Sequence, residues 1–244
     1  MAVIRSIARR ELRSYFATPL AYVFVVIFLT LSGLFTFYLG GFYERGQADL
    51  APFFNFHPWL YLFLVPAIAM RLWAEERKSG SIELLMTLPV TLWQAVLGKF
   101  LAAWLFIGVA LALTFPIWIT VNYLGEPDNG VIVAAYIGSL LMAGGFLAIG
   151  SCISAANRNQ VVAFILTVVI CFLFMLAGFP LVLDFFSGWL PGALLDAVAS
   201  LSFHTHYAAI SKGVLELRDV LYFLLVIGTW LFATTIVLDL KKAD

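Results

Sequence analysis

The residues best suited to specific chemistry lie in a short charged segment, residues 71–89, which reads R-L-W-A-E-E-R-K-S-G-S-I-E-L-L-M-T-L-P. Its charged residues fall close together: Arg71, Glu75, Glu76, Arg77, Lys78 and Glu83. Gly80 can take the positive φ that ends a helix, and Ser81 can cap the helix that follows. Pro89 stops this second helix, whose N-terminal dipole favours the acid Glu83. The spacing therefore predicts two short helices with a break at the glycine.

The second of these helices has the properties of a docking element rather than a catalytic one. Ile82, Leu85 and Met86 share one helical face, and such a face fits an apolar groove on a partner protein. A neighbouring charge such as Glu83 sets the orientation of that contact. The alternative is an ordinary charged loop that only orients the chain in a membrane.

One cluster of potential metal ligands occurs elsewhere in the sequence. It consists of His204 and His206 with either Asp196 or Glu216. Histidines two residues apart point to different sides of a helix, which suits a single metal ion poorly. The zinc motif H-E-x-x-H does not occur. An integral membrane metalloenzyme is therefore disfavoured, and we expect no catalytic residue, metal or cofactor in this chain.

The remaining histidine, His57, stands near Trp59 and Tyr61. Tryptophan and tyrosine are enriched where a membrane meets water. We expect His57 to lie at that interface, to hydrogen-bond locally and to have no functional role.

The composition is that of a membrane protein. The chain is 63% hydrophobic and only 11% charged, whereas soluble domains average about 25% charged residues. A spanning helix needs about 20 mostly apolar residues, and the sequence offers six such runs: residues 20–42, 53–72, 92–121, 131–153, 161–183 and 220–240. We predict an all-α integral membrane protein, with residues 1–244 forming a single six-span domain. The net charge of zero leaves no basic surface large enough for nucleic acid.

The basic residues predict how this domain is oriented. Lysine and arginine concentrate in cytoplasmic segments, and an N-in, C-in arrangement leaves only Arg45, Lys212 and Arg218 outside. The basic residues then placed inside are Arg5, Arg9, Arg10, Arg13, Arg71, Arg77, Lys78, Lys99, Arg158, Lys241 and Lys242. Residues 71–89 are therefore expected in the cytoplasm.

An amphipathic helix is predicted for residues 2–17, before the first span. Arg5, Arg9 and Arg13 form a polar stripe at intervals of four residues, and a basic amphipathic helix of this kind lies in the membrane interface. Thr18-Pro19 should end it, because proline disfavours helix in the preceding residue. The alternative is a cytoplasmic tail whose charges only orient the chain.

Three later segments also carry expectations. Residues 92–121 are too long for one span, so the helix starts in the cytoplasm, tilts or breaks at Pro116. Small residues in the run 131–153 favour close helix packing. Residues 184–219 contain two helical pieces too short to span, which we expect to lie in or dip into the outer leaflet.

Two motifs resemble those of a known family, the ABC-2 type transporter permeases. Residues 75–89 resemble the family signature E-E-R-x-x-G-[ST]-x-E-x-L-x-x-x-P. Residues 210–223, I-S-K-G-V-L-E-L-R-D-V-L-Y-F, resemble the start of the last span in its gliding-motility branch. The six runs and the amphipathic N-terminus fit the same layout.

The resemblance implies an ATP-driven permease, with export as the expected direction, in the bacterial inner membrane. Such permeases act as pairs, so a second permease chain, identical or related, is implied. Two cytoplasmic ATPase subunits would bind the ATP and magnesium, and membrane lipid would surround the spans. The alternative is a non-transporting membrane anchor for a cytoplasmic ATPase in a gliding or secretion machine.

The resemblance also implies roles for particular segments. Residues 1–18 would be the interfacial elbow helix, with Arg5, Arg9, Arg10 and Arg13 on its polar side. Residues 73–89 would be the coupling segment, with these contacts to the ATPase: Glu75, Glu76, Arg77, Gly80, Ser81, Ile82, Glu83, Leu84, Leu85, Met86 and Pro89. Residues 184–219 would form a re-entrant hairpin whose outer-gate residues are Phe185, Phe186, Trp189 and Pro191.

Overall fold

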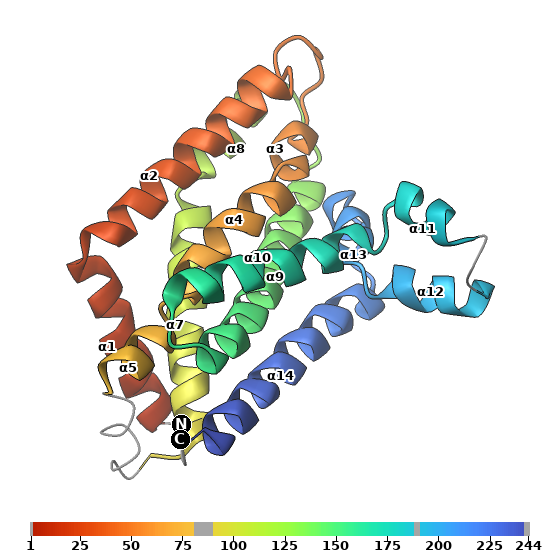
Figure 1. Ribbon diagram of the computed structural model, residues 1–244. Coiled ribbons are helices and arrows are strands. Elements are labelled where there is room, and N and C mark those ends of the chain that lie inside the picture. The colour runs from red at the N-terminus through yellow and green to blue at the C-terminus, as the bar shows by residue number, and fades with distance from the viewer. Residues whose placement is uncertain (1, 81–89, 188–190, 242–244) are drawn as a thin grey trace.

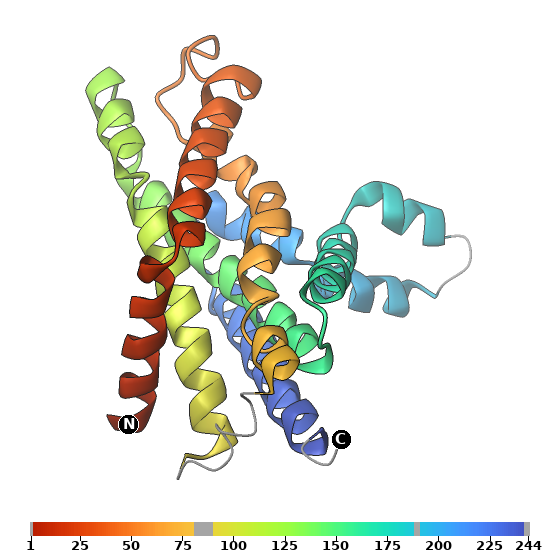
Figure 2. The same cartoon turned by 60° about the vertical axis from the view of Figure 1, so that its left-hand side comes forward.

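The computed structural model describes residues 2–80, 90–187 and 191–241, and within these ranges it contains helices and no strands. Four helical stretches are long and apolar enough to cross a membrane by length and composition: Ala21–Leu39, Leu92–Leu124, Asn129–Ala156 and Leu217–Leu240. The predicted all-α membrane architecture is confirmed at this level, and the order of six spans remains a prediction. The start of the first helix, at Ala2, and the end of the last helix, at Leu240, lie at the same end of the bundle, as an N-in, C-in arrangement requires (Figures 1 and 2).

The N-terminal helix ends where the sequence predicts. Helix α1 (Ala2–Ala17) gives way to α2 (Pro19–Leu34) through Thr18, whose backbone is extended at φ −108° and ψ 142°. Helix α2 continues as a π-helical turn, η1 (Phe35–Leu39). In Figure 2, α1 runs beside the lower part of α7.

Prolines divide the second and third apolar runs into shorter helices. The second run forms α3 (Ala51–Asn55) and α4 (His57–Ala69), which begins with Pro58 in its first turn. The third forms α7 (Leu92–Ala112) and α8 (Phe115–Leu124), with the break directly before Pro116. Proline suits a helix start because it lacks the N–H that has no intrahelical partner there. Of the three explanations for the long third run, the break is thus observed.

Helix α9 (Asn129–Ala156) is the centre of the bundle, since it packs against α4, α7, α10 (Gln160–Leu176) and α14 (Leu217–Leu240) (Figure 1). Its small residues permit these contacts. A Cβ atom added at Gly150 would lie 2.4 Å from the Cβ of Ala69, and one at Gly145 would lie 2.6 Å from the ring of Phe203. The predicted close packing of this span is confirmed.

The fifth apolar run is shorter as a helix than the sequence suggests. Helix α10 ends at Leu176, and α11 (Pro180–Ser187) starts anew at a proline. The two short pieces that follow are α12 (Gly192–Ser200) and α13 (Phe203–Ser211). Helices α11 and α12 project from the side of the bundle in both views, whereas α13 packs on α9.

Two of the three histidines are buried and join helices of the bundle. His206 Nδ1 lies 2.6 Å from Asp219 Oδ1, and this buried pair joins α13 to α14. His57 is fully buried, with Nδ1 2.7 Å from the hydroxyl of Ser139. The prediction that His57 lies at the interface and bonds locally is wrong, because phenylalanine rings of α2 and α3 enclose it in the bundle.

Candidate functional site

The first half of the charged segment forms a short helix at the end of the bundle that holds the N-terminus. A turn from Met70 to Trp73 separates it from α4, and α5 (Ala74–Ser79) follows. Acids fill the first turn of α5 and bases its last turn, which complements the helix dipole. Gly80 ends α5 with a φ of 71°, as predicted.

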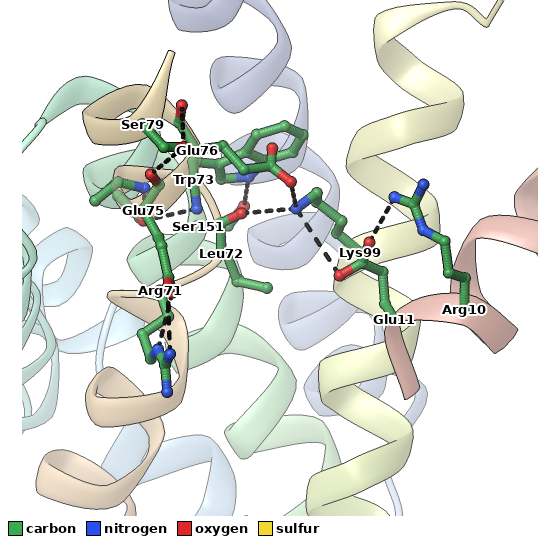
Figure 3. A network of polar contacts seen from close by, with 12 residues as sticks. Arg10, Glu11, Arg71, Leu72, Trp73, Glu75, Glu76, Ser79, Lys99 and Ser151 are labelled. Atoms are coloured by element: carbon green, nitrogen blue, oxygen red, sulfur yellow. Dashed lines mark hydrogen bonds and ion pairs between the residues drawn. The ribbon is translucent and has the colours of Figure 1, made fainter. Parts of the chain in front are cut away.

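Glu76 of α5 binds α7 through Lys99 (Figure 3). The Lys99 ammonium donates to Glu76 Oε1 at 2.5 Å and to the carbonyl of Leu72 at 3.0 Å. It also lies 4.9 Å from the centre of the Trp73 ring, within range of a cation–π contact. Only 5% of the Lys99 side chain is exposed. A charge this buried requires such partners, so α5 and α7 are tied together at one point.

Arg77, the next residue, binds α9. Its Nη1 donates to the carbonyl of Ala155 at 2.6 Å, in the last turn of α9. The final carbonyls of a helix have no intrahelical donor and carry partial negative charge, so a cation there is favourable. Consecutive residues of the charged segment therefore bind two different long helices.

Serines of α9 fix the turn that precedes α5. Ser154 Oγ accepts from the backbone N–H of Trp73 at 3.1 Å and of Ala74 at 3.0 Å, and donates to the carbonyl of Met70 at 2.9 Å. The Trp73 indole donates to Ser151 Oγ at 3.1 Å. Because an unpaired buried donor costs free energy, these bonds hold the turn firmly on α9.

Helix α1 reaches the same point from the other side. Glu11 Oε2 lies 3.9 Å from the Lys99 ammonium (Figure 3). Two packing contacts support this approach. Ile7 lies so close to Gly98 that a Cβ there would stand 2.7 Å from it, and the Tyr15 ring stacks on Phe106 at 5.3 Å. Helices α1, α5 and α7 thus meet at one buried lysine.

Comparison with known protein families identifies the family of this chain. The model of the ABC-2 family transporter proteins matches residues 5–238. The chain belongs to the ABC-2 transporter family. The predicted family is confirmed over nearly the whole length, and the ABC-2 chain is a multi-pass, non-catalytic permease subunit of an ABC transporter. Permeases of this family generally work with a cytoplasmic ATPase subunit. No curated protein matches the chain.

The structure brings together some of the predicted coupling residues of this ABC-2 permease. Glu76 and Arg77 contact α7 and α9 as described, and Glu75 pairs with Arg71 on the same side of the turn at 3.0 Å. That exposed pair contributes little stability. The remaining predicted residues of this segment lie outside the described ranges: Ser81, Ile82, Glu83, Leu84, Leu85, Met86 and Pro89.

The other predicted sites of the ABC-2 chain are only partly described. The basic residues of α1 are all exposed: Arg5, Arg9, Arg10 and Arg13. Phe185 of α11 is 73% exposed, and Pro191 precedes α12 as its N-cap. Phe186 belongs to α11, and Trp189 falls outside the described residues. The interfacial position of α1 and the outer gate stay predictions.

Sequence reasoning missed several residues that hold the segment in place. Glu11 is the one acid in residues 2–17, which signals a specific cationic partner. Ser151 and Ser154 stand three residues apart near the end of an apolar run, where they face the same side of a helix. Lys99 contacts Glu76, which precedes it by 23 residues, and its position in an apolar run does not indicate that partner.

Proposed function

We propose that this permease subunit is driven by a cytoplasmic ATPase that docks on residues 73–89, and that α5 transmits its movement to the spanning helices. The observation that supports this is the pair of contacts made by consecutive residues. Glu76 binds α7 through Lys99, and Arg77 binds the end of α9. A displacement of α5 therefore pulls on two helices at once.

The position of α9 makes such a displacement effective. Because α9 packs against α4, α7, α10, α13 and α14, a shift at its end reaches most of the bundle. In this proposal two ATPase subunits bind ATP and magnesium, close on each other and move the coupling segments of two paired permease chains. The cycle exposes a pathway between the chains to alternate sides of the bacterial inner membrane and exports the cargo. The pattern of basic residues supports a cytoplasmic position for the segment.

The docking proposal is tested by purification from the native membrane in mild detergent. We expect the wild-type chain to retain a stoichiometric ATPase that carries a phosphate-binding P-loop. Glu83→Lys, which reverses a charge on the predicted docking helix, should lower the retained ATPase several-fold, because charge reversal at a contact opposes binding. Glu126→Lys, in a loop predicted on the outer side, is the matched control. Full retention by Glu83→Lys would contradict the docking role.

The six-span order makes a separate prediction about accessibility. Thr205 is exposed on α13, in the segment predicted outside, and Lys78 is exposed on α5, in the segment predicted inside. In intact cells a membrane-impermeant thiol reagent should label Thr205→Cys and spare Lys78→Cys. Both native cysteines are buried and give little background. Labelling of Thr205→Cys only after lysis would show that the order is wrong.

Transport by the reconstituted complex distinguishes a permease from an anchor. An anchor would retain the ATPase equally well but would transport nothing. Breaking the contacts of Glu76 to α7 and of Arg77 to α9 would leave the function of an anchor unchanged. The gliding-motility branch assignment is likewise a proposal, because it depends on the likeness of residues 210–223 alone.

A further inference from the structure

A cavity of about 100 Å³ lies where α1, α5, the end of α4 and the start of α7 meet. Its charged walls are Glu11, Arg71, Glu75 and Lys99, and the hydroxyl side chains of Ser14, Tyr15 and Thr18 complete its polar lining. Figure 3 shows the Arg71–Glu75 pair on one side of Leu72 in that view, and Lys99 with Glu76 and Glu11 on the other. The cavity thus offers both signs of charge within one small volume.

The charges around the cavity are balanced. Its walls carry two cations and two carboxylates, and their nearest partners, Arg10 on Glu11 and Glu76 on Lys99, add one charge of each sign. A simple anion in this cavity would meet the repulsion of both carboxylates, and a simple cation the repulsion of both bases. A ligand that carries one charge of each sign leaves the site neutral and satisfies both pairs. The chemistry of the cavity therefore favours a zwitterion.

The Tyr15 phenol indicates that the two signs act on the same space. Burial raises the pKa of Tyr15, and the nearby Glu11 carboxylate raises it further, while the Arg71 guanidinium lowers it. One hydroxyl therefore feels the acid of α1 and the base at the end of α4 together. A small zwitterion beside this hydroxyl would reach both charges.

The wall groups also retain capacity to bind. Glu11 Oε1 accepts from Arg10 at 2.8 Å, but Glu11 Oε2 lies 3.9 Å from the Lys99 ammonium, which is too far for a hydrogen bond. The Lys99 ammonium donates to Glu76 and Leu72 and keeps a third N–H for a ligand. Arg71 holds Glu75 through Nε and Nη2, but about half of the Glu75 side chain is exposed, so this pair can rearrange at little cost. A primary ammonium has three N–H donors for the carboxylates, and guanidinium groups bind phosphate well.

We propose that this cavity binds the phosphoethanolamine headgroup of a membrane lipid, with the phosphate against Arg71 and Lys99 and the ammonium against Glu11 and Glu75. Thr18, on the cavity wall, stands three residues before the apolar stretch Ala21–Leu39. If this stretch spans the membrane, the cavity lies near the level of the lipid headgroups. Exposed apolar side chains of α2, among them Val23 and Val26, offer surface for acyl chains beyond the bend at Thr18. A lipid in this position links the elbow helix to the turn before α5.

The same chemistry excludes other common lipids. The trimethylammonium group of phosphatidylcholine has no N–H to donate to Glu11 or Glu75. Phosphatidylglycerol has no cation, so its single negative charge meets both carboxylates. Phosphatidylethanolamine alone of these three matches all four charged walls.

The test measures lipid retention by the full chain in detergent. Native mass spectrometry is run with an equimolar mixture of phosphatidylethanolamine, phosphatidylcholine and phosphatidylglycerol that share the same acyl chains. We expect the wild-type chain to retain phosphatidylethanolamine at least fivefold over each of the others. Soluble phosphoethanolamine, added at millimolar concentration, distinguishes recognition of the headgroup from recognition of the whole lipid. Displacement of the lipid shows that the headgroup alone is recognised. Persistence of the lipid shows that the acyl chains contribute.

Variants then locate the site. Arg71→Gln and Glu11→Gln should each lower phosphatidylethanolamine retention at least fivefold, whereas Arg45→Gln should not. Arg45 is the matched control, because it forms another exposed pair with an acid four residues on, Asp49. Equal retention of the three lipids by the wild-type chain would overturn the proposal without any variant, and so would unchanged selectivity in Arg71→Gln. The ATPase takes no part in this measurement, so its outcome is independent of the proposed coupling function.

Discussion

Reversing the charge of Lys99 is expected to abolish the coupling of ATP hydrolysis to this permease, and reversing Glu76 as well is expected to restore it. Lys99→Glu places two carboxylates where the ammonium and Glu76 Oε1 now lie 2.5 Å apart. Loss of one partner from a buried ion pair costs about 3–5 kcal/mol, and the lower end applies here because Glu76 is 24% exposed. The double variant Lys99→Glu/Glu76→Lys re-forms the pair with its signs exchanged.

The measurement is the ATPase activity of the purified complex relative to that of the ATPase alone. We expect the stimulation by the permease to fall at least tenfold in Lys99→Glu and to recover by severalfold in the double variant. Arg45→Glu reverses one charge of an exposed pair in the loop between η1 and α3 and should have no effect. If Lys99→Glu keeps full stimulation, or if the second reversal restores nothing, the pair does not carry the coupling.

A loss of folding must be distinguished from a loss of coupling. The neutral double variant Lys99→Met/Glu76→Gln removes both charges and leaves no unpaired ion, and such replacements are often close to neutral in stability. Its thermal midpoint should remain near that of the wild-type chain. Its stimulation should still fall, because α5 no longer holds α7 through an ion pair.

The sequence predicted the local features of this site well. The break at Gly80 and the end of α1 at Thr18 both depend on the backbone limits of glycine and proline. The division of the third apolar run near Pro116 was one of three explanations that the sequence left open. Such limits act within a few residues, so they can be inferred from one segment at a time. The sequence likewise showed which residues of α5 are charged.

The partners of those charges were not predictable in the same way. Lys99 is separated from Glu76 by 23 residues, and Ala155 from Arg77 by 78. Which residues meet depends on how α9 packs against α4 and α5, and that depends on small residues such as Gly150. His57 illustrates the same limit: its neighbours suggested a membrane interface, whereas Ser139 and the aromatic side chains of other helices enclose it.

Arg77 provides the second contact of α5, and Arg77→Gln is expected to uncouple the permease without unfolding it. Arg77 donates to the carbonyl of Ala155 at 2.6 Å, where the C-terminal end of α9 favours a cation. A hydrogen bond from a charged group contributes about 1.5–3 kcal/mol. Lys241 also donates to the end of α9, at the carbonyl of Ala156, so some positive charge remains there and α9 should stay helical.

A graded series separates the charge of Arg77 from its geometry. Arg77→Lys keeps the charge but loses the planar, multiple-donor guanidinium, so ATPase stimulation should be intermediate between that of the wild-type chain and that of Arg77→Gln. The adjacent Lys78 is exposed, and Lys78→Gln changes the net charge of α5 equally, so it is the matched control and should keep full stimulation. Identical losses in Arg77→Gln and Lys78→Gln would show that only the charge of the segment matters. The hydrogen bond from Arg77 to α9 would then have no part in transmitting the movement of α5. The contact of Glu76 with Lys99 would have to transmit that movement alone.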